Sequence, residues 1–237
     1  MAAGPARACR NNRVTTGQLP LRLPLEAATA RDDLVVSLAN ASAVEFLDAW
    51  PRWPVMTAVV AGPTGAGKSH LAQIWAARAD ARFLTPGVDD LPSGPGAWVV
   101  EDLARGAFSE QWLFHLLNAV RAHEGHLLLT SRRWPGDWGI ALPDLASRMR
   151  LAHVVELHEP DDTLLHGVLV KLFSDRQLAV APNVIDYLAM RMERSLASAQ
   201  RIVEAVDGLS LSEQKPATRA IAARALEVVE TTKALGH

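Results

Sequence analysis

The chain has 237 residues, of which 49% are hydrophobic and 21% are charged, so it is long enough for one large domain or two smaller ones. Its 24 basic and 26 acidic residues give a formal net charge of -2, which offers no overall attraction for nucleic acid. The single cysteine, Cys9, excludes a disulfide framework and a cysteine-based zinc site, and it fits the reducing cytoplasm.

The first segment, residues 1–26, is predicted to be a flexible N-terminal tail. Residues 1–17 contain arginines but no hydrophobic block, so a secretory signal is not expected. The sequence GQLPLRLPLE at 17–26 alternates leucine with other residues and contains two prolines, which disfavour a helix and a central strand. We therefore expect an extended, apolar ribbon here. No apolar run in the chain approaches the length that crosses a bilayer, so no membrane association is expected.

Residues 27–159 alternate strand and helix patterns, which is typical of a parallel α/β sheet. LVVSL at 34–38 predicts a short strand or an extended entry, and NASAVEFLDAW at 40–50 predicts a helix that Asn40 or Ser42 caps. Further strands, several of them continuous apolar runs, are predicted at 55–62, 81–85, 97–102, 126–131 and 152–157. Helices are predicted between them at 67–80, 109–125 and 142–149.

Beyond Pro160 the apolar residues recur three and four positions apart, which predicts helices only. Asp161 or Asp162 can cap the first of these helices, and Gly208 and Gly236 can close the last two. The predicted helices are 161–178, 182–194, 195–208 and 216–236. We therefore expect a small all-helical second domain at 160–237.

A glycine-rich loop, AGPTGAGKSH, follows the predicted strand at 55–62 and opens a predicted helix. It has the spacing of a phosphate-binding loop: a glycine, four residues, a glycine, a lysine and a serine. Glycines let the backbone amides converge on phosphate oxygens, the lysine reaches the outer phosphates, and the helix N-terminus favours an anion. The predicted nucleotide-binding residues are Gly62, Pro63, Thr64, Gly65, Ala66, Gly67, Lys68, Ser69 and His70.

Two acidic residues, Glu101 and Asp102, follow the apolar strand AWVV. Hydrolysis of a nucleotide requires an acidic group for Mg²⁺ and one that orients the attacking water. We predict Mg²⁺ ligands at Ser69, Glu101 and Asp102, with a catalytic role for Asp102.

Together these motifs resemble the AAA+ ATPases, and more narrowly the DnaA/Hda branch, over about residues 18–237. TSRRWP stands where that branch carries its first sensor loop, and LASRM stands where it carries its arginine finger. The resemblance implies a P-loop AAA+ parallel sheet domain flanked by helices at 27–159 and a helical lid domain at 160–237. It also implies ADP or ATP with Mg²⁺ as cofactors and Arg148 as a catalytic arginine finger.

Three positions depart from the pattern of that branch. Glu101 stands first where aspartate is usual, which implies a looser Mg²⁺ contact. Arg132 stands where aspartate is common, which implies weak intrinsic ATP hydrolysis. Ala197 stands at the second sensor arginine, with Arg194 and Arg201 about one turn away. We select Arg194 as a nucleotide ligand, and loss of this contact is the alternative.

The ribbon segment QLPLRL resembles the segment with which the Hda members of this branch dock on the DNA polymerase sliding clamp. A stiff ribbon loses less entropy when it enters a hydrophobic groove. The alternative is that its leucines pack on the chain's own domain. The predicted clamp-binding residues are Gln18, Leu19, Leu21 and Leu23.

The resemblance implies a negative regulator of replication initiation. Its partners would be the replication initiator DnaA, the clamp (beta subunit) and, through the clamp, DNA. The chain ends at His237, after the lid, so we expect no DNA-reading domain of the initiator type. Self-assembly into a homo-oligomer stays open. Two other functions also stay open, namely a helicase loader or single-stranded-DNA adaptor, and a P-loop kinase that acts on a small molecule.

Overall fold

One parallel sheet organises the first part of the protein. The computed structural model describes residues 31–103 and 108–235, so the predicted tail and its docking ribbon lie outside the described residues. The sheet has five strands, all parallel, in the order β2-β3-β4-β1-β5. The strands are β1 (Thr57–Ala61), β2 (Arg82–Phe83), β3 (Ala97–Leu103), β4 (His126–Ser131) and β5 (His153–Glu156). The predicted α/β fold is confirmed.

Helices cover the sheet and then continue alone. The described α-helices are α1 (Ala41–Asp48), α2 (Lys68–Ala79), α3 (Glu110–Ala122), α4 (Pro143–Met149), α5 (Asp162–Asp175), α6 (Pro182–Arg191), α7 (Leu196–Glu213) and α8 (Arg219–Leu235). Two predicted caps are confirmed. Ser109 Oγ accepts a hydrogen bond from the amide of Trp112 at 3.4 Å, and Asp161 Oδ1 accepts one from the amide of Leu164 at 2.7 Å.

Two local expectations are resolved by side-chain and core contacts. Residues 34–37 form the extended entry to α1 and no strand, because the Asn40 side chain bonds to their backbone, donating to Val35 O at 3.0 Å and accepting from Ser37 N at 2.8 Å. The predicted stop at Gly208 is wrong, because α7 continues to Glu213. A glycine inside a helix costs only about 1 kcal/mol, and the buried residues on both sides of it offset that cost.

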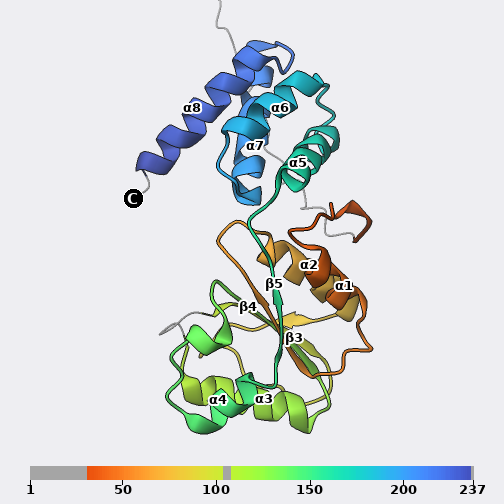
Figure 1. Ribbon diagram of the computed structural model, residues 1–237, viewed down its shortest axis with the longest axis vertical. Coiled ribbons are helices and arrows are strands. Elements are labelled where there is room, and N and C mark those ends of the chain that lie inside the picture. The colour runs from red at the N-terminus through yellow and green to blue at the C-terminus, as the bar shows by residue number, and fades with distance from the viewer. Residues whose placement is uncertain (1–30, 104–107, 236–237) are drawn as a thin grey trace, which may run out of the picture.

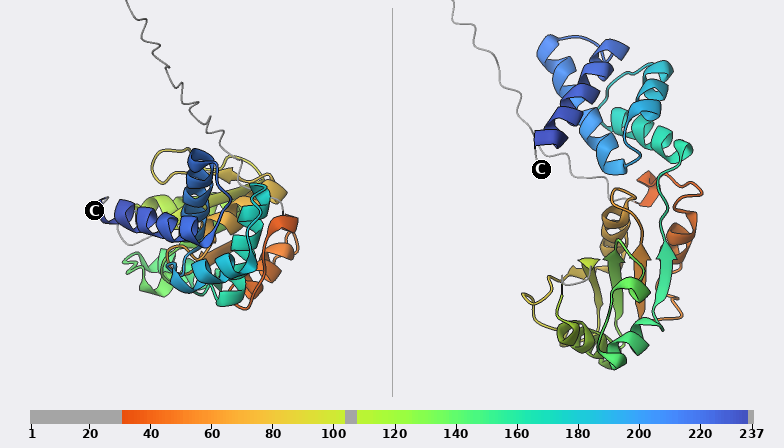
Figure 2. Two further views of the ribbon diagram at one scale, coloured as in Figure 1. Left: turned by 90° about the horizontal axis from the view of Figure 1, so that it is seen from above. Right: turned by 60° about the vertical axis from the view of Figure 1, so that its left-hand side comes forward.

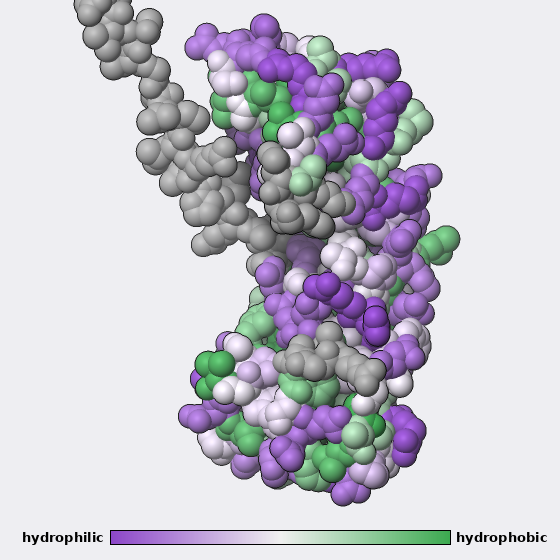
Figure 3. Space-filling model, turned by 90° about the vertical axis from the view of Figure 1, so that its left-hand side faces the viewer, coloured by the Kyte–Doolittle hydropathy of each residue, from purple (hydrophilic) through white to green (hydrophobic). Residues whose placement is uncertain are grey.

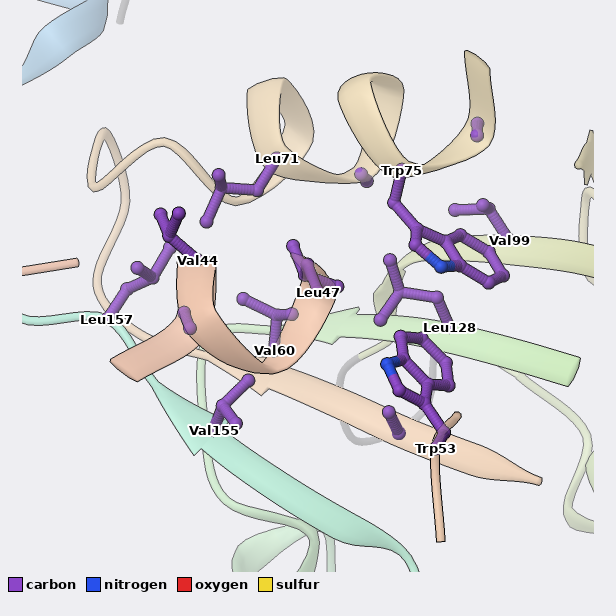
Figure 4. Close-up of a cluster of buried hydrophobic side chains, with 14 of the residues drawn as sticks. Val44, Leu47, Trp53, Val60, Leu71, Trp75, Val99, Leu128, Val155 and Leu157 are labelled. Carbon is purple, nitrogen blue, oxygen red and sulfur yellow. The ribbon is translucent and has the colours of Figure 1, made fainter. Parts of the chain in front are cut away.

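The sheet is apolar on both faces. Val60 and Leu128 belong to the core under α1 and α2, whereas Val59 belongs to the core under α3 and α4. Trp53 stacks on Trp75 of α2 with ring centroids 5.1 Å apart, and Figure 4 shows Leu128 beside these two indoles. The result is a helix–sheet–helix sandwich whose strands carry apolar side chains in both directions, as continuous apolar runs predict.

Helices α5–α8 form a second part with its own core. Their fully buried side chains include Leu165, Phe173, Leu188 and Val203. Figure 1 and Figure 2 show these helices gathered at one end of an elongated molecule, beyond α2 and the sheet. The face in Figure 3 mixes hydrophilic and hydrophobic residues over both parts. Within residues 31–103 and 108–235, none of the helices has the length and apolar character needed to cross a membrane.

Leu128 lies at the centre of the sheet and is 0% exposed, whereas Leu38 is 92% exposed. We expect Leu128→Ala to lower the free energy of unfolding by about 2–5 kcal/mol, because it removes buried methyl groups and leaves a cavity. Leu38→Ala is the matched control and should change it by less than about 0.5 kcal/mol. Denaturant unfolding of both variants measures the difference. Equal losses would contradict the core described above.

Candidate nucleotide site

The phosphate-loop sequence connects the carboxyl end of β1 to α2, as predicted. Gly65 and Gly67 have φ angles of +80° and +100°, which side chains with a Cβ rarely adopt. Gly67 directly precedes α2, and the loop therefore leads into the N-terminus of a 12-residue helix. The backbone thus has the turn and the helix end that bind phosphate in loops of this sequence.

Lys68 is buried against its own loop. Its ammonium Nζ donates to the carbonyl oxygens of Gly62 and Pro63, each at 2.8 Å. Burial lowers the pKa of Lys68, the charge of Arg132 adds to this lowering, and the charge of Asp102 opposes it. An ammonium has three donors, so the two carbonyl bonds leave one for a phosphate oxygen.

The acidic residues lie within an irregularity near the end of β3. The register between β3 and β4 shifts between Val100 and Leu103, and Asp102 within the shift has a left-handed φ of +52°. The amide of Asp102 donates to Thr130 Oγ1 at 2.9 Å. Among the described residues, Glu101 Oε1 is a buried oxygen without a hydrogen-bond partner. The two acids therefore have different surroundings.

Asp102 is paired with Arg132, the residue that departs from the expected sensor sequence. Arg132 Nε and Nη2 donate to the two carboxylate oxygens at 3.0 and 2.8 Å. Sequence reasoning identified both residues but not their contact, which requires β3 and β4 to be neighbours. Spacing along the chain gives no signal for it.

The predicted Mg²⁺ ligands fit a metal unequally. Ser69 is exposed at the start of α2, and the orphaned Glu101 oxygen has the chemistry of a ligand. The Asp102 carboxylate is already neutralised by a guanidinium, so it does not present a free charge. Within the described residues no group of three or more His, Cys, Asp or Glu side chains gathers at one place. A metal role for these residues stays a prediction.

The N-terminus of α7 lies on the phosphate loop. The Leu196 amide donates to Gly65 O at 2.9 Å, and a Cβ at Gly65 would overlap the Ser195 side chain. Arg194, one residue earlier, pairs with Asp162 at 2.7 Å. Its predicted contact with a nucleotide stays a prediction. Sequence reasoning missed Ser195 and Leu196, although their position just before Ala197 was the available signal.

His70 is half-buried near the lid rather than open to solvent. Burial lowers its pKa, the charge of Lys171 on α5 adds to the lowering, and the charge of Asp33 opposes it. Lys171 Nζ also lies 3.3 Å from an Asp33 carboxylate oxygen. These charges connect α2, the N-terminal segment and the lid beside the phosphate loop.

Arg148 lies near the amino ends of the strands, whereas the phosphate loop lies at their carboxyl ends. It is in the last turn of α4, before β5, and β5 pairs in parallel with β1 so that His153 faces Ala58. Its guanidinium carbon lies 5.1 Å from the centre of the Phe114 ring. The five residues of β1 span roughly 16 Å, so Arg148 is remote from its own chain's phosphate loop.

Comparison with solved structures places this architecture among known folds. The chain is similar to domain III of the replication initiation protein DnaA from Thermotoga maritima, with a TM-score of 0.70, 15% identity, and coverage of 87% of this chain and 99% of that chain. It is also similar to AMPPCP-bound DnaA from Aquifex aeolicus, with a TM-score of 0.64, 18% identity, and coverage of 80% and 68%. For the RuvB Holliday junction branch migration motor from Thermotoga maritima, the TM-score is 0.66 and the identity 15%, with coverage of 84% of this chain and 72% of that chain. No protein-family model matches the sequence.

The sheet order, the phosphate-loop sequence and the helical part after the sheet define the class: the protein has an AAA+ fold. Within that class the fold is DnaA-like, as the resemblance of its motifs implies. At these identities the likeness shows the fold alone.

Gly65 and Gly87 separate backbone strain from steric overlap. Both have positive φ angles, but a Cβ on Gly87 would meet nothing within 4 Å, whereas one on Gly65 would overlap Ser195. We expect Gly87→Ala to cost about 1–2 kcal/mol of stability from its left-handed backbone. Gly65→Ala should cost more, because α7 must also move away from the loop. Thermal unfolding compares the two variants, and an equal loss would contradict the contact between lid and loop.

Proposed function

We propose that this protein is an Hda-like negative regulator of replication initiation. It binds an adenine nucleotide, docks on the DNA polymerase sliding clamp, and uses Arg148 to stimulate hydrolysis of ATP bound to the initiator DnaA. DNA takes part indirectly, through the clamp. The observation that carries the proposal is the position of Arg148 near the amino ends of the strands, away from the chain's own phosphate loop at their carboxyl ends.

Binding of ADP or ATP is supported by the phosphate loop and by the fold. The loop has two glycines with positive φ angles, a buried lysine and, directly after it, the N-terminus of α2. Helix N-termini favour anions because their partial positive charges and unpaired amides face the ligand. The similar DnaA from Aquifex aeolicus is bound to AMPPCP, an adenine nucleotide analogue. The adenine base is therefore part of the proposal.

Weak hydrolysis by the chain itself follows from the environment of Asp102. The proposed catalytic role requires a free carboxylate that accepts a hydrogen bond from water or holds Mg²⁺. In the structure both carboxylate oxygens accept from Arg132. We therefore propose that the bound nucleotide acts mainly as a structural ligand that holds the lid against the phosphate loop.

An arginine acting on a partner's nucleotide requires a fixed and accessible guanidinium. Phe114 of α3 provides a flat surface on which the Arg148 group stacks. A cavity beside it is lined by Arg121, Leu117 and Leu151, the last of which is 75% exposed. This edge of the sheet combines cationic and apolar groups, which suits contact with a partner that carries phosphates.

Two alternatives use the same fold. A helicase loader or single-stranded-DNA adaptor would need a cationic strip along one face, and the net charge of -2 gives it little support. A small-molecule kinase would need a closed acceptor pocket beside the phosphate loop. One cavity between α1 and α2 and another beside Arg148 are lined by no residue of the phosphate loop. Binding to the isolated clamp distinguishes the proposed regulator from both.

The first prediction from this proposal concerns Arg148. Arg148→Ala should retain the fold, the bound nucleotide and clamp binding, but should reduce stimulated hydrolysis by about a thousandfold, the effect typical of an arginine finger. Arg148→Lys should recover little of it, because an ammonium lacks the planar fork. The measurement is the rate of ADP formation from DnaA-bound ATP in the presence of DNA-loaded clamp. Arg150→Ala is the matched control, and wild-type stimulation by Arg148→Ala would assign the role to another residue.

The second prediction concerns the ribbon outside the described residues. Replacing Gln18, Leu21 and Leu23 by alanine should abolish clamp binding, because each leucine buried in a groove contributes roughly 1.5–3 kcal/mol. A micromolar contact amounts to only about 8 kcal/mol in total. Leu25→Ala lies in the same ribbon outside the docking segment and serves as the control. Clamp pull-down and thermal unfolding measure the result, and retained binding or an unfolded variant would contradict the docking role.

A further inference from the structure

Arg132 makes a forked ion pair at the sheet edge where the phosphate loop begins. Its Nε and Nη2 atoms donate to both carboxylate oxygens of Asp102. These bonds use two of the five N–H donors of an arginine and leave three for another acceptor. A guanidinium binds phosphate oxygens with the same fork geometry as carboxylate oxygens. The Arg132 guanidinium, while paired with Asp102, can therefore also bind an anionic ligand.

Backbone pairing holds Arg132 next to the phosphate loop. Arg132 follows Ser131, whose carbonyl oxygen accepts from the Gly62 amide at 3.1 Å. The charges of Arg132 and Asp102 both act on the pKa of Lys68, in opposite directions. Arg132 thus lies within electrostatic reach of the lysine that the sequence assigns to the phosphates.

Stability does not account for this ion pair. The side chains of Arg132 and Asp102 are 57% and 53% exposed, and exposed pairs contribute little to folding. Asp102 also adopts a left-handed backbone, which is uncommon outside glycine and occurs preferentially at ligand sites. The arrangement combines a strained backbone with a weakly stabilising contact beside a binding loop.

We propose that Arg132, held on Asp102, binds the phosphates of a nucleoside diphosphate in place of a bridging magnesium ion, so that this chain binds the diphosphate without a divalent cation. The proposal rests on the nucleotide binding proposed above. Of the two acids predicted to hold a bridging metal, Asp102 is paired with the guanidinium, which leaves only Glu101, whose Oε1 is buried, as an anionic ligand. A guanidinium carries one positive charge and Mg²⁺ carries two, which favours a diphosphate over the more negative triphosphate.

The experiment measures the affinity of the full-length protein for ADP, with Mg²⁺ and with EDTA, by calorimetry. The wild type should bind ADP equally well in both, within about twofold. Arg132→Ala should weaken binding at least about tenfold in EDTA, because charge-assisted hydrogen bonds to phosphate are lost. Mg²⁺ should restore binding to this variant, because Asp102 is then free. Arg133→Ala removes the same charge one residue away and should behave as the wild type.

Lys68→Ala tests whether ADP binds at the phosphate loop, and it should weaken binding in both conditions. Loss of wild-type binding on addition of EDTA would overturn the proposal, as would an Arg132→Ala variant that matches the wild type in EDTA. Absence of ADP binding in every condition would overturn it together with the proposed nucleotide. Stimulation of DnaA-bound ATP hydrolysis through Arg148 is measured separately, so the regulatory function can hold when the Arg132 proposal fails.

Discussion

The pairing of β4 with β3 on one side and β1 on the other fixes the groups of the nucleotide site. Ser131, the last residue of β4, faces Ala61 of β1 and Leu103 of β3. Its hydroxyl donates to Leu103 O at 2.6 Å and accepts from the Trp138 indole at 3.0 Å. The phosphate loop follows β1, Arg132 follows β4, and the acidic residues lie in the last part of β3, before Leu103. Parallel strands place their carboxyl ends at one edge, so residues far apart in sequence meet there.

Because the strands are parallel, their amino ends all lie on the side of the sheet away from the phosphate loop. The chain enters β5 at that side, so the end of α4 lies too far away to contact a nucleotide bound at the chain's own loop. Arg148 is stacked on Phe114 there, beside exposed apolar groups. The proposed division of labour, with one nucleotide held by the chain and another acted on in a partner, is a consequence of strand direction. It does not require any movement within the sheet.

Polar contacts join helices α5–α8, the lid, to the phosphate loop and to the segment before α1. Leu196 meets Gly65 on the loop, and the Asp161 carboxylate, which caps α5, accepts from the Ala39 amide at 3.3 Å. Lys171 reaches Asp33 at 3.3 Å. Such contacts are weaker than a shared hydrophobic core, so a ligand at the loop can change the lid's position at small energetic cost. These contacts are the physical basis for the proposed role of the nucleotide as a structural ligand.

The features that the sequence determined by itself are those that depend only on residues close together along the chain. Apolar runs and glycine spacing predict the buried strands, the phosphate loop and the caps at Ser109 and Asp161, because each depends on neighbours along the chain. Only the tertiary structure decided the continuation of α7 through Gly208, where burial outweighs local preference. It alone also decided the contact between Asp102 and Arg132, which are 30 positions apart. That contact depends on strand order, which no local pattern encodes, because side chains at a sheet edge meet only after the strands have paired.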